Sequence, residues 1–204
     1  MRYPGAERKI VRPILSFRQY RAMDIFLLTA IGCLCEALIV FASTVWFPDQ
    51  LYSLSVIAAV SGIVMIRWGI FAAIPAAAMG LLHCALLGAG TQQTLIYTLG
   101  GCLCLALVPV IGKVSWQTIS ESGANCVFYG MVCALLVQLG RAAAALLCGY
   151  PFSAAVLYFT TDVLSVLFAM VVIWIVRHLD GILEDQKHYL DRVSREKESG
   201  GMDE

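Results

Sequence analysis

The sequence predicts an all-α integral membrane protein, a six-transmembrane-helix bundle with both termini in the cytoplasm. Three observations predict this fold class. Of the 204 residues, 60% are hydrophobic and only 14% are charged, which is less charge than a soluble domain of this size carries. The charged residues lie almost entirely before residue 25 and after residue 176. Between these points the chain is a series of apolar segments near the ~20 residues that a helix needs to cross a bilayer core.

The charge distribution divides the chain into three parts. Residues 1–23 form a basic arm with six Lys or Arg residues and one Glu, residues 24–176 form the transmembrane domain, and residues 177–204 form a cytoplasmic tail. Apolar residues recur at helical spacing in the tail with charges between them, which predicts an amphipathic helix. These tail residues are Ile182, Leu183, Tyr189, Leu190 and Val193.

Each of the six expected helices ends at a charge, a turn signal or an interfacial aromatic residue. Asp24 suits the N-cap of the first helix, and Trp46 suits the opposite membrane interface. The second apolar segment is the shortest and ends at Arg67, while Pro75 predicts a kink in the third. The expected helices cover residues 24–46, 51–66, 68–88, 94–111, 125–148 and 153–176.

The placement of Lys and Arg predicts the orientation of the bundle. The N-terminal arm, Arg67, Lys113 and the tail all fall on one side of the expected helices. The three opposite turns, at 47–50, 88–93 and 149–152, contain no Lys or Arg. Because basic residues are enriched in cytoplasmic loops, both termini are expected inside and the three turns outside.

One arginine lies in the middle of the apolar run Leu135–Leu147. The guanidinium of Arg141 stays ionised and is costly in hydrocarbon, so a carboxylate, backbone carbonyls or water must compensate it. With the predicted topology and ~1.5 Å of rise per residue, Arg141, Glu36, His83 and Asp162 all lie roughly 8–15 Å below the outer surface. The sequence leaves open whether Arg141 pairs with Glu36 or with Asp162.

These polar residues predict a small-molecule pocket that opens outward. Gln138 shares a helix face with Arg141, Tyr158 shares one with Asp162, and Tyr97 adds an aromatic wall from the fourth helix. The expected substrate-binding residues are Glu36, His83, Tyr97, Gln138, Arg141, Tyr158 and Asp162. With His83 neutral, their charge is about −1, which mildly favours a neutral, cationic or zwitterionic ligand; protonation of one carboxylate would cancel this preference. The alternative is that Arg141 forms an ion pair that serves only the structure of the bundle.

Several chemistries find no support in the sequence. All eight cysteines fall inside apolar segments, where cysteine acts as a small hydrophobe, so no metal, cofactor or disulfide set is expected. No G-x-x-x-x-G-K-[ST], H-E-x-x-H or G-x-S-x-G motif occurs, so ATP hydrolysis must belong to partners and no catalytic residue is predicted. The chain is not expected to be an enzyme or to bind nucleic acid.

From about Arg18 to the tail, the chain resembles an S component, the substrate-binding membrane subunit of energy-coupling factor (ECF) transporters. The resemblance rests on a length near 200 residues, six expected helices with both termini inside, and the basic start Arg18-Gln-Tyr-Arg-Ala-Met-Asp24. It also rests on rows of small residues spaced by four. In the first helix the row is Thr29, Cys33 and Ala37, where the family usually carries alanines that contact the coupling subunit.

The resemblance implies uptake of a vitamin or related micronutrient across a bacterial cell membrane. The S component captures the substrate outside and associates with a transmembrane coupling subunit and two cytoplasmic ATPases. Two other classes stay open from the residues themselves. One is a non-transporting membrane scaffold, of a cell-shape or secretion type, which the basic arm and the tail would suit. The other is an intramembrane enzyme that uses His83 and a carboxylate as acid and base or as metal ligands.

Overall fold

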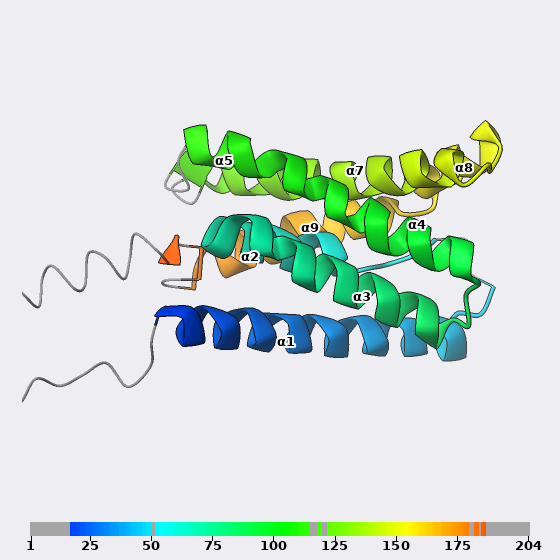
Figure 1. Cartoon of the computed structure of the whole chain (residues 1–204), viewed down its shortest axis with the longest axis horizontal. Coiled ribbons are helices and arrows are strands. Elements are labelled where there is room, and N and C mark those ends of the chain that lie inside the picture. Colours follow the sequence, from blue (N-terminus) through cyan, green and yellow to red (C-terminus); the bar gives the residue numbers. More distant parts are fainter. Residues whose placement is uncertain are drawn as a thin grey trace, which may run out of the picture.

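The computed structural model describes residues 17–49, 52–114, 118–119, 122–179, 182–183 and 185–186. Within these ranges the only regular secondary structure is helix (Figure 1), and two of the helical segments, η1 and η2, are short 3₁₀ helices. The elements are α1 (Phe17–Trp46), α2 (Ile57–Trp68), η1 (Gly69–Ala72), α3 (Ala73–Leu86), α4 (Thr91–Gly101), η2 (Cys102–Leu107), α5 (Val108–Val114), α7 (Gly123–Leu147), α8 (Phe152–Thr160) and α9 (Val163–Val176).

Among the described residues, five helical runs are long and apolar enough to cross a membrane, which confirms the all-α class of an apolar bundle. They are Phe17–Trp46, Ile57–Leu86, Thr91–Gly112, Gly123–Leu147 and Phe152–Val176. The count differs from the expected six because Ile57–Leu86 includes most of both the second and the third expected helix. Six membrane passes and cytoplasmic termini stay predictions.

The chain reverses direction inside the run Ile57–Leu86. Asp24 and Glu36 are 12 residues apart on the continuous helix α1, which corresponds to about 18 Å. At one end of α2, Arg67 pairs with Asp24 at 2.7 Å, whereas the Val56 N–H at the other end donates to Glu36 at 2.8 Å. On α3, His83 again contacts Glu36 at 2.8 Å. Helix α2 therefore runs from the level of Glu36 to that of Asp24, and α3 runs back.

This geometry corrects the expected helix at 51–66. Residues 52–56 are not helical, and α2 has only 12 residues, or about 18 Å, which is too short to cross a bilayer core alone. Gly69 has φ +60°, a left-handed conformation that suits glycine, at the point where the chain turns into η1 and α3. We call the two ends of the bundle the Asp24 end and the Trp46 end, after the residues of α1 that mark them (Figure 1).

Helix α2 forms the centre of the bundle. Every residue of α2 except Val60 is buried, and α1, α3, α7 and α9 all pack against it. A helix that is apolar on all sides belongs in a core. In contrast, α1 exposes a row of large apolar side chains that includes Phe26, Leu34 and Phe41, as a lipid-facing helix would.

Helix α1 begins earlier than expected, at Phe17 instead of Asp24. Residues 17–23 of the expected arm are thus helical, and Asp24 is not an N-cap. Its carboxylate instead accepts hydrogen bonds from Arg67 Nε at 2.8 Å and from Trp68 Nε1 at 2.5 Å. Residues 1–16 of the arm lie outside the described residues.

The start of the tail packs against the Asp24 end. The Ile182 carbonyl accepts a hydrogen bond from Arg67 Nη1 at 3.0 Å, and the Tyr20 hydroxyl donates to Gln186 at 3.1 Å. Leu183 is buried. The rest of the expected amphipathic helix, residues 187–204, lies outside the described residues.

One further expectation about the helices is wrong. The expected helix 153–176 is interrupted at Thr161–Asp162, which separates α8 from α9. Pro75 is the third residue of α3, in the first turn, where a missing N–H is tolerated. The expected kink at this residue stays a prediction.

Helices α4 and α7 cross at two glycines. A Cβ atom added to Gly100 would lie 2.6 Å from the backbone N and Cα of Arg141, and one added to Gly140 would overlap the Gly100 carbonyl oxygen. Only glycine permits so close an approach of the two backbones. The crossing therefore places Arg141 beside Tyr97, which lies about one turn from Gly100 on α4.

Alanine at this crossing should destabilise the bundle. We expect Gly100→Ala or Gly140→Ala to lower the melting temperature by about 5 °C, because overpacking costs about 2 kcal/mol in a protein of this size. Unfolding can be followed in detergent with a dye that reacts with newly exposed thiols. The control is Gly112→Ala, since a Cβ there meets none of the described atoms within 4 Å. If the melting temperature fell by the same amount in all three variants, close packing at the crossing would not be the cause.

Candidate functional site

Two interruptions of helical structure meet inside the bundle. One is the non-helical segment 52–56 before α2, and the other is Thr161–Asp162 between α8 and α9. The Ser53 N–H donates to the Thr161 carbonyl at 2.9 Å, and the Ser55 N–H donates to Ser165 Oγ at 2.9 Å. Unpaired backbone groups are costly in an apolar environment. Each interruption therefore supplies the partners that the other needs.

Asp162 is the centre of the first polar cluster. Its Oδ2 accepts a hydrogen bond from Arg141 Nη1 at 2.8 Å, and its Oδ1 accepts from the Ser53 hydroxyl at 3.1 Å and from the Ser165 hydroxyl. Its backbone carbonyl accepts from Gln138 Nε2 at 2.9 Å. Arg141 and Asp162 are 2% and 3% exposed. This ion pair is thus shielded from solvent and held by α7, α9 and the segment before α2.

Glu36 is the centre of the second cluster and is completely buried. Its Oε2 accepts from the Val56 N–H at 2.8 Å and from the Ser55 hydroxyl at 3.2 Å, while its Oε1 contacts His83 Nδ1 at 2.8 Å. The carboxylate therefore lies at the N-terminus of α2. There the unpaired N–H groups and the helix dipole favour a negative charge.

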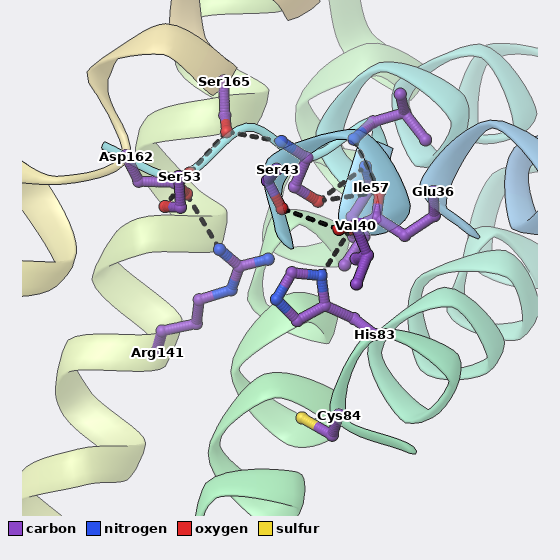
Figure 2. Close-up of polar contacts among 12 residues, drawn as sticks. Glu36, Val40, Ser43, Ser53, Ile57, His83, Cys84, Arg141, Asp162 and Ser165 are labelled. Atoms are coloured by element: carbon purple, nitrogen blue, oxygen red, sulfur yellow. Dashed lines mark hydrogen bonds and ion pairs between the residues drawn. The ribbon is translucent and has the colours of Figure 1, made fainter. Parts of the chain in front are cut away.

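Tyr97 joins the two clusters. The His83 ring stacks on the Tyr97 ring with centroids 4.9 Å apart, and Arg141 Cζ lies 4.4 Å from the same ring centroid. Tyr158 meets Tyr97 edge-on at 6.1 Å. Figure 2 shows Arg141 and His83 close together, with Arg141 turned toward Asp162 and His83 toward Glu36. The two carboxylates, Arg141 and His83 thus form a single buried network.

Two cavities border this network toward the Trp46 end. One has a volume of about 190 Å³ and the other of about 480 Å³. Both are lined by Ser53, Tyr97 and Thr161, so Tyr97 lies at their common boundary. Arg141, Asp162, Tyr150 and Tyr158 line the smaller cavity, and His83 lines the larger one. The larger cavity also touches Phe47 and Leu87, in or beside the turns that end α1 and α3.

The seven residues expected to form the site do lie together, but they have different surroundings. His83, Tyr97, Arg141, Tyr158 and Asp162 line a cavity. Glu36 and Gln138 line neither of these two cavities, and they hold the helix interruptions in place instead. The structure also pairs Arg141 with Asp162 and Glu36 with His83, which the sequence left open.

Sequence reasoning missed Ser53, Ser55 and Thr161. Ser53 and Thr161 line both cavities, and Ser55 links Glu36 to the segment before α2. One available signal was the shortness of the apolar segment that ends at Arg67. Another was the alternation of two serines within it, which favours an extended conformation over a membrane helix.

The chain matches no family model, curated protein or solved structure in the three comparisons that were made. Within the described ranges, no three or more His, Cys, Asp or Glu side chains converge in a way that could hold a metal ion. The fold and the site therefore define a class only: an apolar helical bundle with a buried ion-pair network beside two cavities. That arrangement can bind and orient a small polar molecule.

Proposed function

We propose that this chain is the substrate-binding membrane subunit of an ECF-type importer. In this proposal the bundle crosses the cytoplasmic membrane of a bacterium six times. One of these passes is the segment 52–68, which consists of the non-helical residues 52–56 followed by α2. Both termini are cytoplasmic, and the Trp46 end faces outward. A vitamin-like molecule binds there, and a coupling subunit with two cytoplasmic ATPases drives its import.

The observation that carries the proposal is the position of the Arg141–Asp162 pair at a cavity. An ion pair that only joined helices would need no empty space beside it, whereas these two residues line a cavity of about 190 Å³ together with Tyr97 and Tyr158. Aromatic walls with a few convergent polar groups are typical of small-molecule sites. Interrupted helices around a polar centre are also common at the binding sites of membrane transporters.

The orientation is supported by the charges at the two ends. Arg18 and Arg21 lie at the start of α1 and Arg67 pairs with Asp24, so all three are at the Asp24 end, and the turns at the Trp46 end contain no Lys or Arg. If basic residues mark the cytoplasmic side, the two cavities lie toward the outside. A binding subunit that captures its substrate from the medium requires this arrangement.

The test is to identify small molecules that co-purify with the full chain. The protein is purified in mild detergent, its small molecules are released with organic solvent, and they are identified by mass spectrometry. We expect one vitamin-like compound in near-stoichiometric amount. Tyr97→Leu should lose it, because Tyr97 borders both cavities, and Tyr20→Leu at the Asp24 end should keep it.

A parallel pull-down from host membranes tests the partners. Retention of a coupling subunit and ATPases would support the importer. A protein that carries no compound and retains none of these partners would contradict the proposal and favour the scaffold class. Turnover of a lipid by the purified chain would favour the enzyme class instead.

A further inference from the structure

Arg141 has more hydrogen-bond donors than the described residues satisfy. A guanidinium presents five N–H donors and cannot lose its charge in a protein. Arg141 Nη1 donates to Asp162, but Nε and Nη2 are buried and have no hydrogen-bond partner among the described residues. Because buried donors are nearly always paired, an acceptor is missing at this edge of the side chain.

The unpaired atoms form one edge of the guanidinium. The Nε–H and one Nη2–H point in nearly the same direction, at a spacing that matches the two oxygens of a carboxylate. Neither acid of the network supplies them: Asp162 binds Nη1, and Glu36 binds His83 and the start of α2. The edge therefore lacks an acceptor among the described residues and could take one from outside the chain.

We propose that the ligand is a small organic carboxylic acid whose carboxylate binds Arg141 Nε and Nη2. This proposal rests on the binding function proposed above. Its body lies among Tyr97, Tyr150 and Tyr158, which line the smaller cavity together with Arg141. A planar monoanion fits a single two-donor edge. A phosphate carries more charge and a third oxygen for which this edge offers no donor.

The Tyr97 ring lies against the Arg141 guanidinium. Nε and Nη2 are closed to solvent in this structure, and the Tyr97 ring covers the guanidinium at 4.4 Å. Tyr97 also lies between the two cavities. Rotation of this side chain would join the cavities and admit the carboxylate. The displaced ring can then pack against the body of the ligand.

The probe is the water-soluble small-molecule fraction of yeast extract, separated on an anion exchanger into acidic and non-acidic pools. Each pool is added to the purified full chain, and the shift in melting temperature is measured. We expect the acidic pool to stabilise the protein and to lose this effect after methyl esterification, which blocks carboxylates. Treatment with phosphatase should leave the effect unchanged.

Two matched variants test the role of the edge. Arg141→Lys keeps a cation for Asp162 but removes the planar pair of donors. We therefore expect the variant to need at least about ten times the concentration of the acidic pool for the same shift in melting temperature. Arg21→Lys is the control, because Arg21 stacks on Phe17 and Phe71 outside the site. An unchanged dose for Arg141→Lys would overturn the proposal. If this variant does not fold, the esterification test on the natural chain still shows whether the ligand binds through a carboxylate.

The remaining outcomes separate this inference from the function on which it rests. Stabilisation by the non-acidic pool alone would overturn the carboxylate and leave a binding subunit in place. Stabilisation that survives esterification but is lost with phosphatase would also overturn it, in favour of a phosphate ligand. If neither pool stabilises the natural chain, both the carboxylate and the binding function are wrong.

Discussion

Arg141→Leu should lower the melting temperature of the protein by about 10 °C or more. The substitution leaves the Asp162 carboxylate buried without its cation, and breaking a buried ion pair on one side costs about 3–5 kcal/mol. The eight free cysteines allow the measurement, because a thiol-reactive dye reports unfolding in detergent. The same variant should bind none of the co-purifying compound.

The double variant Arg141→Leu/Asp162→Asn separates stability from binding. Asparagine removes the negative charge but keeps an oxygen that can accept from Ser53 and Ser165. Replacement of both members of a buried ion pair is often close to neutral. We therefore expect the double variant to recover most of the lost stability and still bind no ligand. Full recovery of ligand binding would mean that the pair has only a structural role.

Glu36→Leu should have the second large effect. It removes the acceptor of the Val56 N–H and of the Ser55 hydroxyl and the partner of His83, all at the buried start of α2. Unsatisfied buried groups cost about 1–3 kcal/mol each, so we expect a loss of roughly 3 kcal/mol or more. Thermal unfolding measures this loss. Hydrogen exchange of the amides at residues 56–59 should rise, because these amides lie in the turn that Glu36 caps.

Glu36→Gln is the matched control for this prediction. Its amide oxygen can still accept from the start of α2, and its amide nitrogen can donate to His83 Nδ1. The variant loses only the favourable interaction of a carboxylate with the helix dipole, so we expect less than half of the destabilisation of Glu36→Leu. Equal melting temperatures for the two variants would show that capping by Glu36 does not stabilise α2.

The sequence was most informative where local composition decides the outcome. Apolar segments between charged ends indicated a helical bundle, and α7 and α9 end within one residue of their expected positions. Polar residues inside those segments identified the candidate site, because an ionisable group in an apolar run needs a partner. All seven of these side chains do lie together, while their role in binding stays a prediction.

The sequence was least informative where two distant segments satisfy each other. The segment 52–56 and the interruption at Thr161–Asp162 read as parts of continuous helices, since the residues around them are apolar. They depart from helix because the Ser53 hydroxyl donates to Asp162 and the Ser55 N–H donates to the Ser165 hydroxyl oxygen, each across more than 100 positions of the chain. A hydrogen-bond partner so distant in the chain cannot be predicted from the residues next to these segments.

The sequence by itself determined that the chain is an apolar helical bundle with Arg141, Glu36, His83 and Asp162 inside it. Only the tertiary structure decided that Arg141 pairs with Asp162, that Glu36 caps α2, and that Tyr97 lies between the cavities. The reason is physical: burial of a charge follows from the residues next to it in the chain. The choice of its partner follows from which helices touch, and here the crossing at Gly100 and Gly140 brings Arg141 against α4.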